Sequence, residues 1–346
     1  MSRDERIFNL QLSGKILMRA IITGVGHFVP DQKMTNEDLE RMVDTNDEWI
    51  TSRTGIKERR VLEKDKPTSY MAVQAAKTIL DRNNVPADEL DMIIVATSTP
   101  DMMMPSTAAV VQNELNASGA WGFDLSGGCS GFLFALATAS QFIETGRHQK
   151  VMVIGADKMS AVLNYKDRDT CVIFGDGAGA VLLESSDAKD AGIEDFILHL
   201  DGSGAKYLNI PGGGSSQPAS YETIDKKLHC ICQDGKTVFR HAITGMADVS
   251  SEIMKKNNLV GKDIRLFIPH QANSRIIDAV GKKLGMNPDQ VVINIQNYGN
   301  TTAGTVPIAM SEAYQEKMMK QGDWILLSAY GAGFAWGSLL LKWAMD

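Results

Sequence analysis

The stretch that decides the fold is Asn83-Asn-Val-Pro-Ala-Asp-Glu-Leu-Asp-Met-Ile-Ile-Val95, because the chain contains this pattern twice. The second copy is Asn257-Asn-Leu-Val-Gly-Lys-Asp-Ile-Arg-Leu-Phe-Ile-Pro269, which aligns without a gap at a constant offset of 174 residues (257 − 83). Each copy follows a helical pattern, over residues 71–82 and 239–256, and ends in an apolar run. Near-continuous apolar runs are typical of strands in a sheet that is covered on both faces.

A second pair of segments supports the duplication. The stretch Gly175-Asp-Gly-Ala-Gly-Ala-Val-Leu-Leu-Glu184 echoes Gly331-Ala-Gly-Phe-Ala-Trp-Gly-Ser-Leu-Leu340, and in both the glycines lead into a strand pattern. We therefore predict an α/β protein built from two duplicated halves, residues 18–190 and 191–346. Residues 1–17 are rich in charge and lack the apolar centre of a signal peptide. We expect them to be an N-terminal tail, either an addition or the product of an upstream start codon.

Cys129 lies in the run Asp124-Leu-Ser-Gly-Gly-Cys-Ser-Gly-Phe132, which precedes an apolar helical pattern up to Phe142. This predicts a tight turn that places a thiol at the N-terminus of a buried helix. The partial positive charge of a helix N-terminus lowers the pKa of a thiol from roughly 8.5, and its free N–H groups can hold an oxyanion. The alternative is a small buried hydrophobic residue without chemistry.

Two later segments favour the catalytic alternative. His270 follows the strand-like residues 264–268, and Asn300 follows a second strand-like stretch, Val291-Val-Ile-Asn-Ile295. Ligands gather at the carboxyl edge of an open α/β sheet, so these two side chains can converge with Cys129 on one point. A thiol beside an imidazole is an arrangement for nucleophilic catalysis.

These motifs make the chain resemble a β-ketoacyl-acyl carrier protein synthase III, a condensing enzyme of the thiolase superfamily. The resemblance rests on six segments that occur in the family's order from about Met18 to the last residues: 49–60, 124–132, 174–180, 269–273, 299–302 and 330–337. The Cys-His-Asn set separates the chain from elongating synthases, which use Cys-His-His, and from thiolases, which use a second cysteine. The family likeness implies a thiolase-like five-layered αβαβα sandwich and a homodimer.

The resemblance also implies a reaction and roles for individual residues. Cys129 would take the acyl group of an acyl-CoA, with the backbone N–H groups of Cys129 and Ala332 as the oxyanion hole. Malonyl-acyl carrier protein would then lose CO₂ while His270 and Asn300 hold its thioester oxygen. The resemblance implies that no metal and no redox cofactor is required. Acyl-CoA takes part as a substrate and not as a cofactor. Ala332 stands where many relatives carry glycine, and it preserves the backbone donor if alanine suits its φ and ψ.

Further residues match substrate-binding positions of the family. Trp49 would stack on adenine, although partial burial in the core is the commoner fate of a tryptophan. The other matching positions that would contact coenzyme A or its pantetheine arm are Arg53, Thr54, Arg168 and Asn273. Met104 stands where many relatives carry a phenylalanine that reaches across the dimer, so we expect a pocket that admits branched or medium acyl chains as well as acetyl. The alternative is that Met102-Met-Met104 only packs a dimer interface.

A basic helix face is predicted near the site. Arg275 and Lys282 are seven residues apart, with Lys283 beside them, and Arg240 extends the group. Such a face is commonly only solvated surface. On an acidic protein it also suits the docking of an acidic carrier protein.

Composition agrees with this class. The chain has 346 residues, of which 44% are hydrophobic and 22% charged, and a net charge of −7 that disfavours general nucleic-acid binding. No apolar run reaches the ~18 residues that span a membrane, so we expect a cytoplasmic protein. Four cysteines argue against a disulfide framework. Cys230 and Cys232 beside His229 could suggest a metal, but the alternation over residues 227–231 favours a structural hairpin.

The glycine-rich segment 174–180 does not predict nucleotide binding, and the segment 212–220 is predicted by its composition to be a surface loop. A phosphate loop opens a helix, whereas residues 174–180 lead into an apolar strand, so close backbone approach explains their glycines better. Two rival functions stay open. One is a thiolase-fold acyltransferase or condensing enzyme of secondary metabolism. The other is a catalytically inactive carrier-protein-binding scaffold, which a complete Cys-His-Asn set disfavours.

Overall fold

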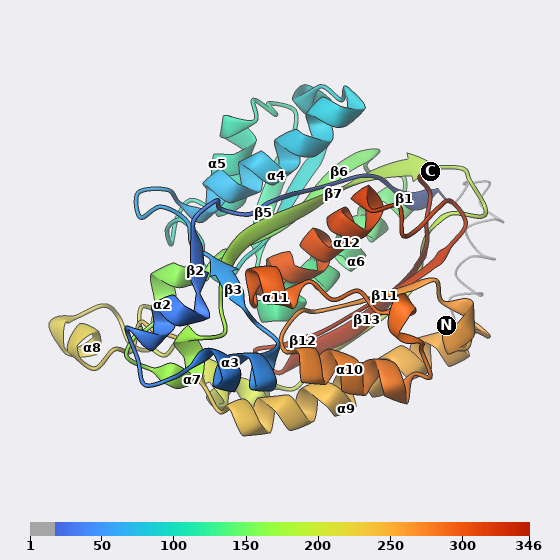
Figure 1. The fold of residues 1–346 in the computed structure, drawn as a ribbon. Helices are drawn as coiled ribbons and strands as arrows, with labels where there is room; N and C mark the ends of the chain where they lie inside the picture. The colour runs from blue at the N-terminus through green and yellow to red at the C-terminus, as the bar shows by residue number, and fades with distance from the viewer. Residues whose placement is uncertain (1–17) are drawn as a thin grey trace.

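Two mixed β-sheets and the helices that cover them form five layers, as Figure 1 shows. The computed structural model describes residues 18–346, so the predicted tail of residues 1–17 lies outside the described residues. One helix layer covers the first sheet from outside, two helices lie between the sheets, and a third layer covers the second sheet. The predicted five-layered αβαβα sandwich is confirmed.

The first sheet contains five strands in the order β1-β7-β6-β4-β5. Strand β4 is parallel to both β5 and β6, whereas β7 is antiparallel to β6 and β1. The strands are β1 (Arg19–Phe28), β4 (Met92–Ala96), β5 (Trp121–Leu125), β6 (Lys150–Lys158) and β7 (Asp176–Ser186). All five residues of β4 are buried, which explains its uninterrupted apolar sequence.

The second sheet repeats this order as β11-β12-β13-β8. Strand β11 is parallel to β12, and β13 is antiparallel to β12 and β8, so the four strands take the places of β4, β6, β7 and β1. The strands are β8 (Gly192–Leu200), β11 (Leu266–Pro269), β12 (Trp324–Gly331) and β13 (Ala335–Lys342). The first sheet thus uses residues 19–186 and the second uses residues 192–342.

The repeated stretch folds the same way in both places. In each, a long helix leads through an asparagine and a 3₁₀ turn into a buried strand, β4 or β11. The two asparagines, Asn84 and Asn258, are 174 residues apart (258 − 84) and have left-handed φ values of 52° and 59°. Asparagine tolerates this conformation better than most residues, so a shared backbone turn explains its presence in both copies.

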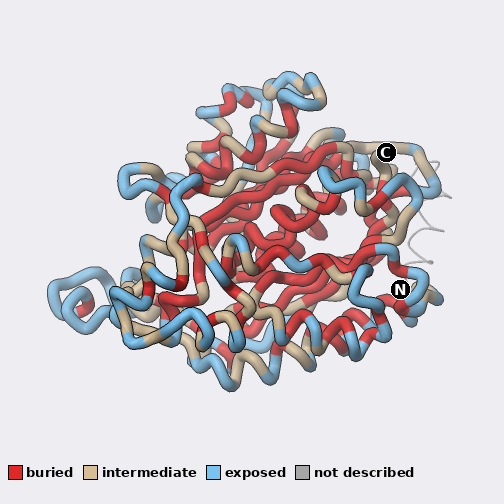
Figure 2. The backbone as a smooth tube through the Cα atoms, viewed as in Figure 1, coloured by how far each residue is buried: buried red, intermediate tan, exposed pale blue. Residues whose placement is uncertain are grey.

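Three apolar cores separate the layers. The largest surrounds the central helices α6 (Gly131–Glu144) and α12 (Thr305–Gln315), which lie between the sheets. The outer helices α4 (Thr68–Asn83) and α5 (Thr107–Glu114) cover the first sheet, and α9 (Gly235–Lys256) and α10 (Ser274–Lys283) cover the second. Figure 2 shows that the sheets and central helices are mostly buried while the outer helices keep one exposed side.

Glycines in β7 allow this strand to touch a central helix. A Cβ built on Gly179 would lie 2.6 Å from the nitrogen of Ile308 and 2.7 Å from the carbonyl carbon of Pro307, both in α12. A side chain at this position would collide with backbone atoms. The prediction that the glycines of residues 174–180 permit close backbone approach is therefore confirmed.

Two sequence predictions about strands are wrong. Residues 291–295 do not form a strand, and only Val291 makes an isolated parallel bridge with Phe267 in the place that β5 takes beside β4. The Gln271 side chain binds the carbonyl of Val292 and the N–H of Asn294, so it takes backbone groups that a longer strand would pair. The chain then enters the short helix α11 (Ile295–Tyr298).

The predicted hairpin at residues 227–231 is likewise absent. These residues form turns after helix α8 (Tyr221–Asp225), and Lys227 has a left-handed φ of 57° that a strand cannot accommodate. Only Cys232–Gln233 (β10) pairs with Leu208–Asn209 (β9). The smaller elements that frame the site from the first half are β2 (Lys33–Thr35), α2 (Asn36–Glu40), α3 (Asp47–Thr54), β3 (Glu58–Arg60) and α7 (Arg168–Cys171).

Candidate active site

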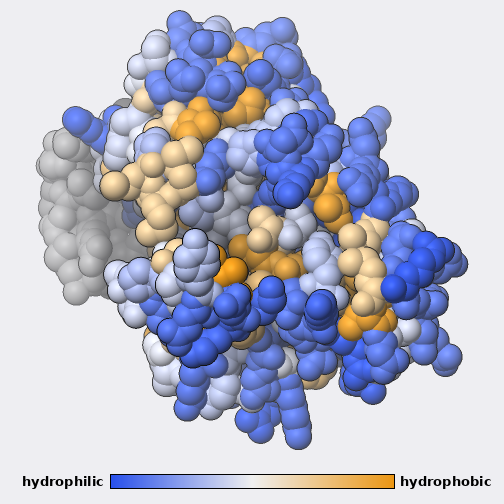
Figure 3. Space-filling model, turned by 90° about the vertical axis from the view of Figure 1, so that its left-hand side faces the viewer, coloured by the Kyte–Doolittle hydropathy of each residue, from blue (hydrophilic) through white to orange (hydrophobic). Residues whose placement is uncertain are grey.

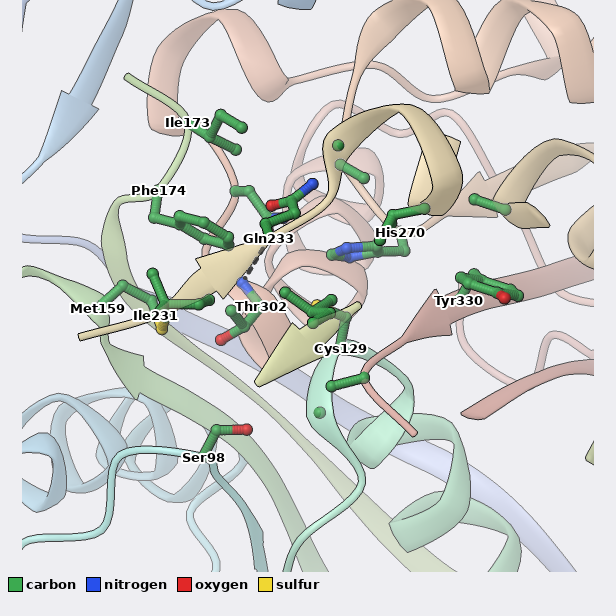
Figure 4. A pocket seen from close by; sticks show the side chains of 18 of the residues that line it. Ser98, Cys129, Met159, Ile173, Phe174, Ile231, Gln233, His270, Thr302 and Tyr330 are labelled. Atoms are coloured by element: carbon green, nitrogen blue, oxygen red, sulfur yellow. Dashed lines mark hydrogen bonds between the residues drawn. The ribbon is translucent and has the colours of Figure 1, made fainter. Parts of the chain in front are cut away.

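A cavity of about 350 Å³ brings Cys129, His270, Asn300 and Ala332 together. Figure 4 shows Cys129 and His270 reaching the cavity from different elements, with Thr302 next to them. The rest of the wall is largely apolar and includes Met159, Ile173, Phe174, Leu208, Ile210, Ile231, Val238 and Phe239. A few polar groups within an apolar wall are typical of a site that holds a small molecule.

Cys129 lies on a short 3₁₀ helix, Gly128–Ser130, that leads directly into α6. Gly128 has a φ of 55°, which a glycine adopts without strain and which turns the chain after β5. The cysteine is 7% exposed. The predicted turn before a buried helix is therefore present.

The electrostatics of the thiol differ from the prediction. Burial raises the pKa of Cys129 to about 12, and the negative charge of Asp157 acts in the same direction. Its own backbone N–H and a hydrogen bond from Asn300 lower the pKa but do not compensate. The expectation of a lowered pKa is wrong, because the loss of water around the thiolate raises the pKa by more than these two hydrogen bonds lower it. Cys129 is a neutral thiol at pH 7.

His270 follows β11 and is 1% exposed. Burial lowers its pKa to about 3, so the imidazole is neutral at pH 7. Its Nδ1 lies 2.6 Å from Oγ1 of Thr305. The same Oγ1 donates to the carbonyl oxygen of Thr302 at 3.1 Å, so Nδ1 either donates to Oγ1 or accepts its proton in place of that carbonyl. If the hydroxyl donates to Nδ1, the other ring nitrogen, Nε2, carries the proton.

Asn300 is held by backbone on both sides. Its N–H donates to the carbonyl of Ile173 at 2.9 Å, and its Oδ1 accepts from the N–H of Thr302 at 2.8 Å. Because Oδ1 is engaged, the amide presents Nδ2 as a donor, and its hydrogen bond to Cys129 agrees with this orientation.

The backbone of residues 331–332 runs directly against the turn that carries Cys129. A Cβ on Gly128 would lie 3.0 Å from the nitrogen of Ala332, and a Cβ on Gly331 would lie 2.7 Å from the nitrogen of Cys129. Ala332 does not belong to the residues with a positive φ, so alanine suits its backbone. The backbone around Cys129 and the backbone around Ala332 thus lie against each other, and both residues line the cavity.

Comparisons with known proteins show the family of this chain. The family model described as 3-oxoacyl-[acyl-carrier-protein (ACP)] synthase III matches residues 123–202, and its C-terminal counterpart matches residues 254–343. The β-ketoacyl-[acyl-carrier-protein] synthase III of Chlorobaculum tepidum is 51% identical over 328 residues, which cover 94% of this chain and 100% of the relative. The chain belongs to the β-ketoacyl-acyl carrier protein synthase III family. It is accordingly an acyltransferase of the condensing type.

Solved structures of the family share the architecture. The 3-oxoacyl-[acyl-carrier-protein] synthase III of Aquifex aeolicus has a TM-score of 0.87 and 43% identity, covering 94% of this chain and 100% of its own. A priming β-ketosynthase from a polyketide biosynthetic pathway also has a TM-score of 0.87, with 30% identity over 96% of this chain and 98% of its own.

A cationic aromatic stack lies where the synthase was expected to hold coenzyme A. Trp49 is half-buried in α3, and the guanidinium carbons of Arg53 and Arg168 each lie 4.8 Å from its ring centroid. A planar guanidinium stacks on an indole ring favourably. These three predicted residues therefore form one group, although none of them lines the cavity itself.

Asn273 joins this group to the cavity, which it lines. Its side chain donates to the carbonyl of Arg53 at 2.9 Å and caps α10 by accepting from the N–H of Arg275. Thr54 differs from the expectation. It is buried, and its hydroxyl donates to Ile50 at 2.6 Å and accepts from the N–H of Ile56, which leaves no exposed hydroxyl for a substrate.

The remaining predicted residues lie on the surface. Met104 is 84% exposed and does not line the cavity of its own chain. Arg240, Arg275, Lys282 and Lys283 are exposed on α9 and α10. Arg275 stacks on Phe239, a cavity-lining residue, with its guanidinium carbon 5.2 Å from the ring centroid. Lys282 pairs with Asp278 at 2.7 Å, so part of the predicted basic face is neutralised.

The sequence did not reveal the residues that support the side chains of Cys129, His270 and Asn300. Asp157, Thr302 and Thr305 are buried and bind one another or the groups named above. One signal was available for Asp157, a carboxylate at the end of the near-continuous apolar run 151–156. A charged residue in such a run is buried, and a buried charge needs several partners.

Within residues 18–346, no group of three or more His, Cys, Asp or Glu side chains is arranged to hold a metal ion. No helix in the same range is long and apolar enough to cross a membrane.

Proposed function

We propose that this synthase III primes fatty acid synthesis by condensing an acyl-CoA with malonyl-acyl carrier protein. The observation that carries the proposal is the convergence of Cys129, His270 and Asn300 on one buried, largely apolar cavity. No metal or redox cofactor takes part, and acyl-CoA is a substrate.

In the first half-reaction, the sulfur of Cys129 attacks the thioester carbonyl carbon of the acyl-CoA. The carbonyl oxygen becomes an oxyanion that the N–H groups of Cys129 and Ala332 hold. The bond to the coenzyme A sulfur then breaks, and the proton of the Cys129 thiol ends on that sulfur. Removing one such oxyanion donor typically costs ~10²–10³ in rate.

In the second half-reaction, the bond between the malonyl carboxylate and the α-carbon breaks and CO₂ leaves. The electron pair forms an enolate whose oxygen accepts hydrogen bonds from Asn300 Nδ2 and from His270. The α-carbon attacks the acyl-Cys129 carbonyl, a carbon–carbon bond forms, and Cys129 leaves as a thiolate that takes up a proton.

The role of His270 requires a proton on Nε2. The Thr305 hydroxyl then donates to Nδ1, 2.6 Å away, instead of to the Thr302 carbonyl. A buried neutral imidazole with one fixed tautomer donates at any pH well above 3, to which burial lowers the pKa. His270 therefore acts as a hydrogen-bond donor and not as a cation.

Residues outside the cavity and at its wall bind the substrates before they react. Trp49 with Arg53 and Arg168 holds the adenine and phosphates of coenzyme A, and Asn273 contacts the pantetheine arm. The basic residues Arg240, Arg275, Lys282 and Lys283 dock the acidic carrier protein. Arg275 supports this assignment, because it stacks on Phe239 at the wall of the cavity.

The active form is a cytoplasmic homodimer in this proposal. Strand β5 is an edge of its sheet in the described chain, and its Trp121 is 48% exposed. Exposed edge strands pair readily with another chain. Figure 3 shows hydrophobic patches on an otherwise hydrophilic face, and the exposed large apolar residues of the described chain include Met102, Met103, Met104 and Leu200.

Mass spectrometry tests the proposal. The protein is exposed to a panel of acyl-CoAs and then to malonyl-acyl carrier protein. We expect acylation of Cys129 alone, release of CO₂ and loss of the adduct on condensation, with no adduct on Cys129→Ala. Acyl adducts that persist on Cys129→Ala would sink the assignment of the nucleophile.

A second candidate function is priming in a polyketide pathway, which the likeness to the priming β-ketosynthase favours. The chemistry is the same, but the partner carrier protein differs. Comparing condensation rates with malonyl groups on a fatty-acid carrier and on a polyketide carrier distinguishes the two functions.

A further inference from the structure

Asp157 is a buried carboxylate that the reaction described above does not use. It lies near the end of β6 and is completely buried. Its Oδ1 accepts four hydrogen bonds, from the hydroxyls of Thr97 (3.1 Å) and Thr99 (2.9 Å) and from the N–H groups of Ser98 (2.7 Å) and Thr99 (3.0 Å). Its Oδ2 accepts from the hydroxyl of Thr302 and from the N–H of Ala303 at 3.3 Å. This carboxylate therefore joins a loop of the first half to a loop of the second.

Thr302 has a φ of 49°, in the left-handed region. This conformation is a clear outlier for a β-branched residue and persists only where the surroundings hold it. Asp157 supplies that hold, because one of its oxygens binds the Thr302 side chain and the following N–H, that of Ala303. The peptide unit after Thr302 is thus fixed from one side by a single carboxylate.

The N–H of the same residue, Thr302, donates to Oδ1 of Asn300 at 2.8 Å. An amide side chain can otherwise rotate by half a turn and exchange its oxygen and nitrogen. In the exchanged orientation Nδ2 would face the N–H of Thr302, and Oδ1 would face the site where the enolate oxygen forms. The orientation of the Asn300 donor therefore depends on one backbone N–H.

We propose that Asp157 and Thr302 are positioning residues that fix the Asn300 amide with its Nδ2 toward the reacting thioester. This inference rests on the proposed function, because it concerns the donor that stabilises the enolate. Asp157 touches none of the reacting atoms: it acts on condensation through Thr302 and Asn300, and its charge reaches the Cys129 thiol only at a distance, by raising the pKa of that thiol. Its loss impairs condensation and leaves the acylation of Cys129 largely intact, since that step uses the N–H groups of Cys129 and Ala332.

Four variants separate positioning from general structural support. Thr302→Val keeps the shape of the side chain but loses the hydroxyl, and Thr302→Ser keeps the hydroxyl. Thr302→Gly loses the hydroxyl but adopts a positive φ without strain. Asp157→Asn keeps the volume but lacks the second acceptor oxygen. Thr23→Val is the matched control, because the Thr23 hydroxyl is buried in β1 without a hydrogen-bond partner in the described chain.

Single-turnover rates are measured for two separate steps on each variant, the acylation of Cys129 and the release of CO₂ from malonyl-acyl carrier protein by preformed acyl-enzyme. We expect Thr302→Val and Asp157→Asn to slow CO₂ release at least tenfold and acylation less than threefold. The rate of CO₂ release in Thr302→Ser should be within threefold of the native rate. The rate of CO₂ release in Thr302→Gly should be higher than in Thr302→Val. In the double variant Asp157→Asn/Thr302→Gly, the rate of CO₂ release should be little lower than in Thr302→Gly alone.

Equal losses in both steps, or Thr302→Ser no better than Thr302→Val, would overturn the positioning role. Should Asp157→Asn fail to fold, as thermal unfolding would reveal, the three Thr302 variants decide the question alone. If the native protein forms the acyl-enzyme but releases no CO₂ from malonyl-acyl carrier protein, the proposed function fails and this inference with it. If the native protein condenses the two substrates but the variants slow both steps equally, only the positioning role is contradicted, and the proposed function stands.

Discussion

Cys129 and His270 share a cavity in which burial disfavours the charged form of each side chain. The thiol has a pKa raised to about 12 and the imidazole a pKa lowered to about 3. Between these values both groups are neutral. The free enzyme therefore holds a thiol beside a neutral ring and not a thiolate–imidazolium pair.

This neutrality predicts the pH dependence of alkylation. Below a pKa of about 12 the thiolate fraction of Cys129 rises about tenfold for each pH unit. We expect the rate of Cys129 alkylation by iodoacetamide to keep rising through pH 10 without a plateau, as followed by mass spectrometry of the Cys129 peptide. A plateau near the ordinary thiol pKa of roughly 8.5 would contradict the raised pKa.

The two proposed donors should affect one half-reaction more than the other. His270→Ala and Asn300→Ala remove groups that hold the malonyl thioester oxygen, so each should slow condensation by about 10²–10³. Acylation of Cys129 by acyl-CoA should fall much less. Rapid-quench assays of the two steps measure this split, and equal losses in both steps would show that the roles are assigned wrongly.

At the scale of elements, β7 touches α12, the helix that follows the loop with Asn300 and Thr302. Gly179→Ala would place a Cβ 2.6 Å from the backbone of α12. We expect a loss of about 1–3 kcal/mol in the free energy of unfolding, because backbone atoms cannot move aside as a side chain would. Gly202→Ala is the control, since a Cβ there meets no atom within 4 Å. Urea denaturation of both variants checks the difference.

The elements that sequence predicted well are those whose pattern is local. In each repeat the helix has a helical pattern and the strand a continuous apolar run, and both copies fold as expected. Residues 291–295 have the same apolar character but lose their backbone partners to the side chain of Gln271, a contact with no local signal. Lys227 disrupts the predicted hairpin for a similar reason, because its left-handed φ is set by the turns around it.

The candidate site was predictable in its residues and not in its electrostatics. Cys129, His270 and Asn300 each follow a strand or a strand-like segment, which marked them as candidates. Cys129 follows β5 of the first sheet and His270 follows β11 of the second, so they meet between two sheets and not at the edge of one. The pKa of Cys129 depends on how completely the two halves enclose it, and no pattern around residue 129 reports that. Asp157 and Thr302 act through contacts 145 residues apart in sequence, which only the folded chain brings together.

At the scale of the whole molecule, Met104 cannot influence the cavity of its own chain, because it is 84% exposed and does not line it. An effect on acyl selectivity must therefore come from a second copy. The test uses a mixed dimer of one native chain and one chain that carries Cys129→Ala and Met104→Phe. Only the cavity of the native chain then reacts. The relative rates for acetyl-, isobutyryl- and hexanoyl-CoA should shift toward acetyl, by about tenfold or more for one methylene.

The control pairs the native chain with a chain that carries Cys129→Ala alone. Identical chain-length preferences in the two pairings would refute a contribution of Met104 across the dimer. A strict preference for acetyl-CoA in both pairings would also refute the expectation of a pocket that admits branched or medium chains.

The assembly of the site from both halves has a consequence for the timing of synthesis. Cys129 leaves the ribosome well before His270, Asn300 and Ala332, which all come from the second half of the chain. Until β12 and β13 are made, the sheet that encloses the thiol does not exist. The nascent chain therefore carries Cys129 without its partners until the last strands dock.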